Sequence, residues 1–326
     1  MIRVGLVGLG GVSKVHIDAY KTLPDVTLVA AADITGEAAK SYGQLEGTGA
    51  RLYTSLDDLL ENEKIDVLDI CTPTYLHAEM VIKAMERGIH VLSEKPMART
   101  AADGERILAA AERTGVRYMT AHVVRFMKPY AYLRSVVRSG ELGKPVHFML
   151  RRLSSAPLWS YENWLLSPEK SVGAPLDLAI HDIDFVYSVF GEPRDISATY
   201  RTFSDDRNDC ISASFLYDGF SVDVTGTFYQ CNYPFTAEFT AIFEDGYMEL
   251  KGGRLTKNGA PVDLATAVTD GQDIGINISS DSAYTEEIAY FLNAVKTGAP
   301  TSLVTPESAL GTIRLIERTV ANAKRV

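Results

Sequence analysis

The run Ser93-Glu94-Lys95-Pro96 sets a lysine between a carboxylate and a proline. It follows the mainly apolar residues 89–92, and proline, which cannot extend a hydrogen-bonded ladder, often marks the first residue beyond a strand. We therefore expect Lys95 at the carboxyl end of a strand, where open parallel sheets bind their ligands. Taken alone, a lysine beside a glutamate is more often a surface ion pair, so its role depends on two further motifs.

The first of these motifs is a carboxylate and a histidine, Asp177 and His181, in a predicted helix that begins near Gly173 and runs to about Phe190. Residues four apart lie on one helix face, one turn apart, and Asp184 continues that face. An acid in this position can orient the imidazole and raise its basicity. Because the reference pKa of histidine is near ~6.5, His181 can accept a proton at neutral pH. An ion pair on the helix surface would explain the same spacing.

The second motif is a glycine-rich turn between a predicted strand, residues 2–7, and a predicted helix. This is the context in which glycines bind a dinucleotide. Gly8 permits the tight turn, and Gly10 lets the backbone approach a pyrophosphate at the helix N-terminus. Ser13 replaces the third glycine and is small enough for helix–strand packing. The candidate cofactor-binding residues of the turn are Gly8, Gly10, Gly11, Val12 and Ser13.

Asp33 ends the second apolar run, residues 26–32, and is the acidic partner that such a turn requires. A carboxylate here can bind the adenosine ribose hydroxyls. It would repel a 2′-phosphate, and Ile34 offers no cation to bind one. The sequence therefore favours NAD over NADP, although an ordinary turn acid is the simpler interpretation of Asp33 by itself.

The elements that position these residues change in character along the chain. Through residue 121, buried runs alternate with helical patterns, which predicts βαβ units and an α/β Rossmann domain with a parallel sheet over residues 1–121. From residue 122 to 326 we expect an α+β domain for substrate binding and oligomerisation. Its β-rich runs between residues 196 and 251 predict a largely antiparallel, open-faced sheet, followed by helices at about 282–296 and 306–324.

Composition excludes several classes of function. A chain of 326 residues is long enough for two domains, and a net charge of −10 disfavours binding to nucleic acid. The sequence contains no apolar run approaching the ~18 residues that span a bilayer, so we expect no membrane partner. The three cysteines, Cys71, Cys210 and Cys231, are far apart, which suits a cytoplasmic protein and supports neither a disulfide framework nor a zinc site.

Taken in order, the motifs of this chain resemble those of the glucose–fructose oxidoreductase/inositol dehydrogenase (Gfo/Idh/MocA) family over about residues 2–190. They are the glycine turn, Thr72-Pro73-x-x-x-His77, Glu94-Lys95-Pro96, His122-x-x-Arg125-Phe126 and Asp177-x-x-x-His181. The chain departs from the family pattern at Ser13 and at Val172-Gly173-Ala174, where many members carry a run of glycines. Because that loop borders the substrate in the family, the second departure affects the expected substrate more than the chemistry.

The resemblance implies a role for each residue. Lys95 would hydrogen-bond the reacting hydroxyl and the nicotinamide ribose, His181 would accept the hydroxyl proton, and Asp177 would hold His181 or a neighbouring hydroxyl. The bond between Lys95 and Pro96 is expected to be cis. Residues that would line the cofactor cleft are Thr72, Pro73, His77, Glu94 and Lys95; a proline-initiated helix with a buried histidine is the alternative interpretation of the first three.

The chemistry of alcohol oxidation agrees with these roles. A fixed ammonium can stabilise the developing alkoxide, and no metal is required. Lys95 is a poor base because its reference pKa, near ~10.4, would have to fall by several units, so His181 is the better proton acceptor.

Three further residues, His122, Arg125 and Trp164, are candidates for substrate binding. Arg125 could instead be a structural ion-pair partner. Trp164, with Trp159 and Tyr161, could instead pack between domains.

The predicted function is hydride transfer between NAD and the CH–OH group of a cyclic polyol, sugar or sugar derivative. The alternatives are an NAD-dependent glycosidase that oxidises its substrate transiently, and a ligand-sensing regulator on the same fold. Because the β-rich domain must cover its sheet, we expect a homodimer or homotetramer. Phenylalanines taken to favour this pairing are Phe215, Phe228, Phe235 and Phe239.

Overall fold

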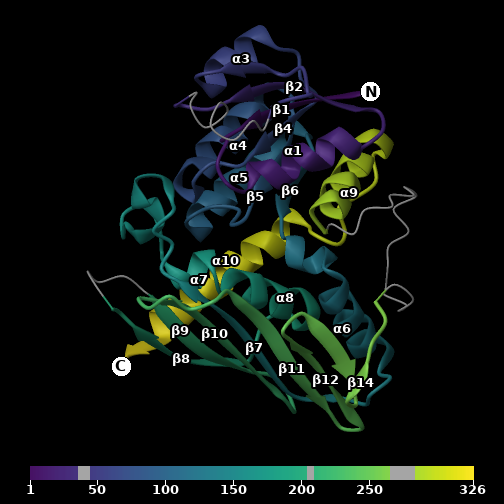
Figure 1. Cartoon of the computed structure of the whole chain (residues 1–326), viewed down its shortest axis with the longest axis vertical. Helices are drawn as coiled ribbons and strands as arrows, with labels where there is room; N and C mark the ends of the chain where they lie inside the picture. Colours follow the sequence, from purple (N-terminus) through teal and green to yellow (C-terminus); the bar gives the residue numbers. More distant parts are fainter. Residues whose placement is uncertain (36–44, 204–208, 265–282) are drawn as a thin grey trace. The chain divides into compact units, whose positions relative to one another are not determined.

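The computed structural model of the chain describes residues 1–35, 45–203, 209–264 and 283–326 (Figure 1). These residues form two compact units. The first comprises residues 1–123 and 283–310, and the second comprises the described residues from 124 to 264 together with 311–326. Whereas the sequence assigned residues 122–326 to one domain, the helix at Ala283–Thr297 packs against the first unit. The predicted start of that helix, at residue 282, lies outside the described residues.

The first unit contains a parallel sheet of six strands in the order β3-β2-β1-β4-β5-β6. The direction of the chain along the sheet reverses at the β1/β4 pair, which makes this pair the switch point where doubly wound sheets bind ligands. The strands are β1 Ile2–Val7, β2 Val26–Ala32, β3 Arg51–Tyr53, β4 Val67–Ile70, β5 His90–Glu94 and β6 Tyr118–Ala121.

Helices cover both faces of this sheet, which explains why most residues of β1, β4, β5 and β6 are buried. The crossover from β1 to β2 runs in the opposite direction to those from β4 to β5 and from β5 to β6. Right-handed crossovers therefore place α1 on one face and α4 with α5 on the other (Figure 1). The helices are α1 Ser13–Thr22, α3 Leu56–Asn62, the 3-10 turn η1 Thr74–Leu76, α4 His77–Glu86, α5 Ala101–Thr114 and α9 Ala283–Thr297, which packs against α1.

Local signals set the ends of several of these helices. The hydroxyls of Ser55 and Thr100 accept hydrogen bonds from the backbone N–H groups of Asp58 and Asp103, at 3.0 and 3.1 Å, and so cap α3 and α5. α5 ends at Gly115 in the left-handed conformation. The Ser55-x-x-Asp58 spacing is typical of a helix start, and the structure shows the cap that it indicates.

The second unit contains a sheet of nine strands in the order β14-β13-β12-β11-β7-β10-β9-β8-β15. Among the described strands, only the β7–β10 and β8–β15 pairs are parallel, which confirms the prediction of a largely antiparallel sheet. The strands are β7 Pro145–Ser155, β8 Asp195–Arg201, β9 Cys210–Leu216, β10 Ser221–Tyr229, β11 Thr236–Phe243, β12 Gly246–Lys251, β13 Arg254–Lys257, β14 Ala260–Pro261 and β15 Ala323–Arg325.

One face of this sheet packs against helices, and the rings of Tyr130, Phe185 and Phe239 meet edge to face in the core between them. The helical segments are η2 Val123–Phe126, α6 Lys128–Ser139, η3 Tyr161–Leu166, α7 Ala174–Asp177, α8 Ile180–Phe190 and α10 Pro306–Asn322. The first five residues of α10 belong to the first unit and the remainder to the second. The helix predicted to run to about residue 324 ends at Asn322, because the next residues pair with β8.

The opposite face of the sheet is mainly polar in the described residues. Arg151 pairs with Glu238, and Asp223 accepts a hydrogen bond from Ser214 and lies 3.4 Å from His147. The phenylalanines that were expected to line an exposed face do not do so, with one exception. Phe215, Phe228 and Phe239 are buried, and only Phe235 is exposed, so the aromatic argument for subunit pairing was wrong for three of its four residues.

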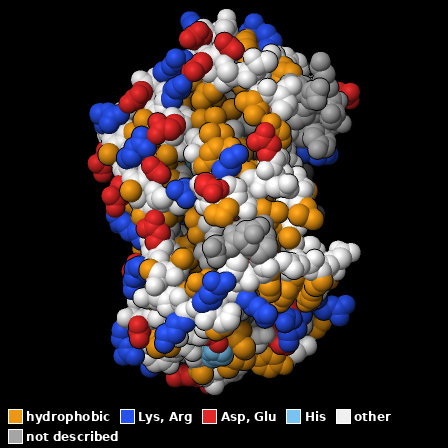
Figure 2. All heavy atoms as spheres, turned by 90° about the vertical axis from the view of Figure 1, so that its left-hand side faces the viewer, with side chains coloured by type: hydrophobic (Ala, Val, Ile, Leu, Met, Phe, Trp, Pro, Cys, Tyr) orange, Lys and Arg blue, Asp and Glu red, His pale blue; other side chains and the backbone are white. Residues whose placement is uncertain are grey.

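Surface ion pairs are frequent. Arg106 and Arg113 of α5 pair with Glu79 and Glu86 of α4. Basic and acidic side chains are similarly interspersed over much of the face in Figure 2.

Two further ion pairs are buried in the second unit. Arg125 binds Asp184 through two hydrogen bonds of 2.6 and 2.8 Å, and Arg152 of β7 binds Asp182 at 2.8 Å. All four side chains are at most 4 % exposed. Thr312 of α10 also donates to Asp184, at 2.9 Å. The two acids thus attach α8 to the sheet, to η2 and to α10.

No helix in the described ranges has the length and apolar character needed to cross a membrane.

Substitution of Asp184 by alanine leaves the Arg125 guanidinium buried without its carboxylate. We expect a loss of about 3–5 kcal/mol in the free energy of unfolding, measured by urea denaturation. The matched control is Glu79→Ala, which breaks an exposed pair and should cost less than about 1 kcal/mol. Equal losses for the two variants would contradict the structural role of the buried pair.

Candidate functional site

The turn after β1 is shaped by a close approach to the neighbouring strand. Gly8 has a φ of +90°, and a Cβ atom there would lie 2.7 Å from the carbonyl oxygen of Cys71. Its N–H donates to the carbonyl of Ala32 at 2.9 Å. Both the conformation and the contact exclude a side chain, so glycine is required at this position.

The next residues of the turn leave space in front of the N-terminus of α1. A Cβ atom at Gly10 or Gly11 would meet nothing within 4 Å. Val12 precedes the helix without capping it, and the first turn contains no acidic residue. The Ser13 hydroxyl donates to the carbonyl of Gly10 at 2.7 Å, so the serine that replaces a glycine also holds the turn. The N-terminus of a helix, with space in front of it, suits an anion such as a pyrophosphate.

Asp33, directly after β2, connects this turn to the adjacent strand end. Its Oδ2 accepts a hydrogen bond from the N–H of Leu9 at 2.9 Å, and its Oδ1 accepts from the N–H and hydroxyl of Thr35. A carboxylate has about four acceptor positions, so this one can still accept from ribose hydroxyls. Ile34 is exposed and carries no charge. These donors and acceptors fit a dinucleotide without a 2′-phosphate.

His77 joins the loops that follow β4 and β5. Its Nδ1 lies 2.8 Å from the carbonyl oxygen of Pro96, and its Nε2 lies 2.8 Å from that of Thr72. The ring is fully buried at the start of α4, and burial lowers its pKa. The buried histidine that the sequence left open as an alternative is therefore present, and it connects the Thr72-Pro73 loop to the loop that follows β5.

Lys95 lies directly after β5, as expected from the proline that follows it. The Lys95–Pro96 peptide bond is cis, which confirms the prediction. The lysine side chain is half-buried, and its backbone N–H donates to Oε2 of Glu94 at 3.0 Å. Thus the candidate residues of the first unit meet at the carboxyl ends of β1, β2, β4 and β5.

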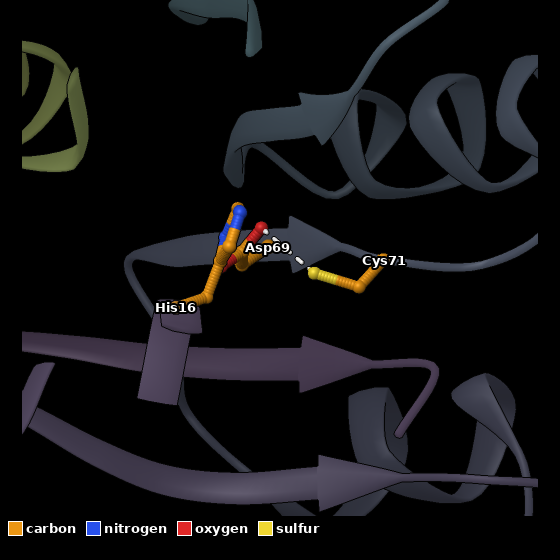
Figure 3. A group of neighbouring side chains, drawn as sticks. All are labelled: His16, Asp69 and Cys71. Atoms are coloured by element: carbon orange, nitrogen blue, oxygen red, sulfur yellow. Dashed lines mark hydrogen bonds and ion pairs between the residues drawn. The ribbon is translucent and has the colours of Figure 1, made fainter. Parts of the chain in front are cut away.

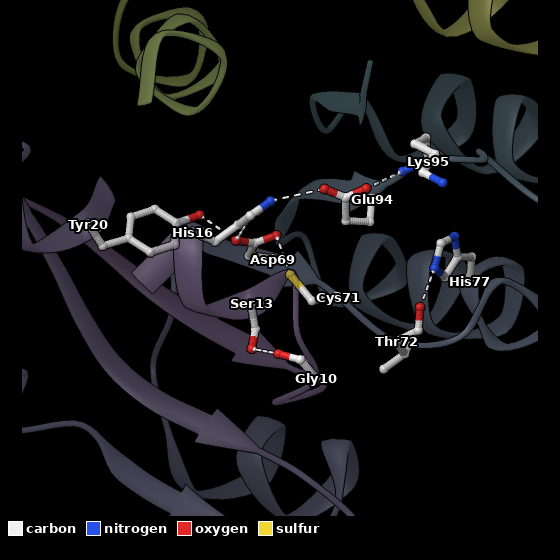
Figure 4. Close-up of polar contacts among 10 residues, drawn as sticks. All are labelled: Gly10, Ser13, His16, Tyr20, Asp69, Cys71, Thr72, His77, Glu94 and Lys95. Atoms are coloured by element: carbon white, nitrogen blue, oxygen red, sulfur yellow. Dashed lines mark hydrogen bonds and ion pairs between the residues drawn. The ribbon is translucent and has the colours of Figure 1, made fainter. Parts of the chain in front are cut away.

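A buried polar group behind this edge was not predicted. His16 of α1 lies between the carboxylates of Asp69 in β4 and Glu94 in β5 (Figure 4). The thiol of Cys71 donates to Asp69, and burial raises the pKa of Cys71 to about 12. Among the described residues, His16, Asp69 and Cys71 also lie close enough together to hold a metal ion (Figure 3). Their spacing in the sequence gives no signal of this.

In the second unit, Asp177 and His181 lie in two helices and not in one. α7 ends at Asp177, and α8 begins at Ile180. The N–H groups of Leu178 and Ala179 both donate to the carbonyl of Ala174, at 3.0 and 2.8 Å, which interrupts the regular helix. The predicted continuous helix was therefore wrong at this point, and the ideal one-turn spacing of the two side chains does not apply.

The interruption coincides with a close contact to the sheet. A Cβ atom at Gly226 of β10 would lie 2.6 Å from the Cβ of Ala179. A glycine in the middle of a strand often marks such an approach, and this signal was available in the sequence. Because Gly226 has no side chain, the segment between Asp177 and His181 can lie directly against β10. The ion pairs of Asp182 and Asp184 then hold α8 in place.

The remaining candidates have different environments. Arg125 is buried in its pair with Asp184, the structural alternative left open by the sequence. His122 is buried after β6, and Trp164 is half-buried in η3, where Glu162 and Asn163 adopt positive φ. Substrate contact by these three residues stays a prediction. The same holds for the pairing of Lys95, in the first unit, with His181 and Asp177, in the second.

Curated relatives match the chain at moderate identity. It is 28% identical to myo-inositol 2-dehydrogenase of Thermotoga maritima over 191 residues, or 59% of this chain and 55% of that protein. It is 29% identical to D-apiose dehydrogenase of Paraburkholderia graminis over 193 residues, or 59% of this chain and 51% of that protein. The aligned part of the chain thus spans about half the length of these relatives.

Solved structures share the fold across nearly the whole chain. An oxidoreductase from Thermotoga maritima superposes with a TM-score of 0.83 at 22% identity, covering 99% of this chain and 96% of that chain. The WlbA dehydrogenase from Bordetella pertussis, in complex with NADH and UDP-GlcNAcA, gives 0.80 at 24% identity, covering 99% and 95%. These similarities confirm the predicted fold class.

Two family models match the chain in sequence. Residues 2–122 match the oxidoreductase family with an NAD-binding Rossmann fold, which confirms NAD as the expected cofactor, and residues 130–249 match the GFO/IDH/MocA C-terminal domain. Together the two matches cover most of the chain, and the chain belongs to the GFO/IDH/MocA family of oxidoreductases.

Proposed function

We propose that the protein is an NAD-dependent dehydrogenase that transfers a hydride between NAD and the CH–OH group of a cyclic polyol, sugar or sugar derivative. One observation carries the proposal: the dinucleotide-type turn with Asp33 and the half-buried Lys95 lie at the same edge of one parallel sheet. The family and the dehydrogenase relatives support it.

Each residue has a distinct task in this proposal. Bound NAD supplies the hydride acceptor. The Lys95 ammonium orients the reacting hydroxyl and stabilises negative charge as it develops on the oxygen. His181 accepts the hydroxyl proton, which the reference pKa of histidine near ~6.5 permits at neutral pH. Asp177, before the interruption that precedes α8, orients His181 or binds a neighbouring hydroxyl.

The relatives support a polyol or sugar as the substrate class and do not identify an individual sugar. Those named here act on myo-inositol and D-apiose, and a further relative from Bacillus subtilis is a glucose-6-phosphate 3-dehydrogenase. Val172-Gly173-Ala174 replaces the expected run of glycines, so this loop should select the substrate. Transient oxidation by a glycosidase, and ligand sensing by a regulator, are not favoured by these dehydrogenase relatives.

Oligomerisation and location complete the proposal. We expect a homodimer or homotetramer in the cytoplasm, formed through the open face of the nine-stranded sheet. Because that face is mainly polar, Arg151 and Glu238 would contribute hydrogen bonds across it.

Light scattering should give a mass of two or four chains, and an Arg151→Glu variant, which sets two acids side by side, should shift the measured mass toward that of one chain. A wild-type monomer at micromolar concentration would refute this assembly.

The catalytic assignment predicts a loss of turnover without a loss of cofactor. Lys95→Ala and His181→Ala should each lower kcat by about 10²–10⁴ on the true substrate, while NADH fluorescence titrations show unchanged affinity. The wild-type substrate is found by following NADH absorbance across inositols, aldoses, amino sugars, sugar phosphates and UDP-sugars. The control is Glu79→Ala, in an exposed ion pair of α4, which should keep full activity. Full turnover by either of the first two variants would remove that residue from the mechanism.

The three turn glycines predict separable effects. Gly8→Ala should destabilise the first unit, because its Cβ would collide with Cys71. Gly10→Ala and Gly11→Ala should leave the melting temperature unchanged, since both positions are open. Gly10→Ala should still weaken NADH binding by about tenfold or more, or ~1.4 kcal/mol, because its methyl group occupies the space for the pyrophosphate. Tight NADH binding by the Gly10 variant would place the cofactor elsewhere.

A further inference from the structure

Five residues form a continuous buried chain of contacts from α1 to Lys95 (Figure 4). The Tyr20 hydroxyl donates to Oδ2 of Asp69 at 2.8 Å, and the same oxygen lies 2.8 Å from Nδ1 of His16. Nε2 of His16 lies 3.1 Å from Oε1 of Glu94, whose Oε2 accepts the backbone N–H of Lys95 at 3.0 Å. The backbone of the proposed catalytic lysine is therefore joined to a core histidine through one carboxylate.

The contacts of His16 determine its protonation state. An ionised carboxylate only accepts hydrogen bonds, so a nitrogen facing one must carry a proton. Both ring nitrogens of His16 face carboxylates, and with both of these ionised each nitrogen donates a proton to its hydrogen bond. Burial lowers the pKa of His16, but Asp69 and Cys71 together raise it by more, and the net pKa lies well above the ordinary value. Burial raises the pKa of Glu94, but the hydrogen bond and charge of His16, together with Lys95, bring the net pKa below the ordinary value.

The groups that face this imidazolium come from every element around it. Tyr20 lies on the same helix, Asp69 and Cys71 lie on and just after β4, and Glu94 and the charge of Lys95 come from the end of β5. From α9, the ring of Tyr284 lies 6.0 Å from that of His16, and Glu287 is buried near Tyr20. Acids outnumber cations in this group, so loss of the positive charge of His16 would leave Asp69 and Glu94 mutually repulsive.

We propose that His16 is a positioning residue for the active site: as a buried imidazolium between Asp69 and Glu94, it fixes the Glu94 carboxylate and, through it, the backbone of Lys95. The link to catalysis rests on the proposed function. The link from His16 to Glu94 and Lys95 rests on the geometry alone. A neutral residue at position 16 would let Glu94 turn away from Asp69, and Lys95 would lose the hydrogen bond that holds its N–H.

The first test observes the charge directly and needs no substrate. In ¹⁵N NMR spectra of the histidine-labelled wild-type protein, with His16→Gln used for assignment, both His16 nitrogens should show imidazolium shifts from pH 6 to 8.5. Titration with an ordinary pKa near ~6.5 would overturn the proposal. So would one equivalent of tightly bound zinc, lost on His16→Gln, because His16 would then serve with Asp69 and Cys71 as a metal ligand.

The same protonation has a thermodynamic consequence. Since the folded pKa is raised, the stabilisation by His16 is complete below the unfolded value of ~6.5 and is lost as pH rises through the folded pKa. Over that interval, the unfolding equilibrium constant of the wild type should rise about tenfold per pH unit relative to His16→Gln. Parallel pH profiles of the two proteins would contradict the assignment.

The second test separates positioning from general structural support. His16→Gln should lower kcat by about tenfold to a hundredfold, with KM changed less than threefold. Adding Asp69→Asn removes one of the repelling carboxylates and should restore at least half of the lost kcat, a recovery that a merely structural defect would not show. Glu79→Gln, in an exposed ion pair of α4, is the control. A double variant as impaired as His16→Gln would overturn the positioning role. If the wild type oxidises no polyol or sugar, the proposed function fails, whereas the NMR result for His16 still stands.

Discussion

Three buried charged groups near the candidate site, Asp182, Asp184 and His16, are matched by opposite charge at hydrogen-bonding distance, and the positions of the candidate site residues depend on this matching. Removing an ion from water costs several kcal/mol, so a buried ion persists only with a partner. Asp182 and Asp184 meet Arg152 and Arg125, and His16 meets Asp69 and Glu94. In each case the pair joins elements far apart in sequence, so it fixes their relative position more strongly than apolar contact, which has no preferred direction.

The second constraint is close backbone approach, which two glycines permit. Gly8 lets the turn after β1 contact the end of β4, and Gly226 lets the junction between α7 and α8 contact β10. The first contact shapes the cofactor turn within the Rossmann unit. The second sets the junction beside which Asp177 and His181 lie. In both units, therefore, the candidate site residues lie near a glycine that permits close backbone contact. Buried ion pairs then hold the neighbouring elements together.

Much of the fold could be predicted from local patterns. The alternation of apolar runs and helices gave the parallel sheet, and proline after Lys95 gave the end of β5. Patterns failed where long-range packing decided the outcome. The regular spacing of Asp177 and His181 predicted one helix, but the helix is interrupted where Ala179 approaches Gly226. Alternation in β-rich segments does not say which face meets the helices, so Phe215, Phe228 and Phe239 were assigned to the wrong side.

The sequence by itself determined the family, the cofactor class and the residues expected to carry the chemistry, because these depend on short motifs whose residue types are set by local geometry. Only the tertiary structure decided that Arg125 is bound to Asp184, and that His16 lies between Asp69 and Glu94. The partners in these three contacts are 59, 53 and 78 positions apart in the sequence, in that order, and no local pattern indicates that they meet. The reason is physical: the charge on a buried side chain is set by neighbours that folding brings together, and not by neighbours in sequence.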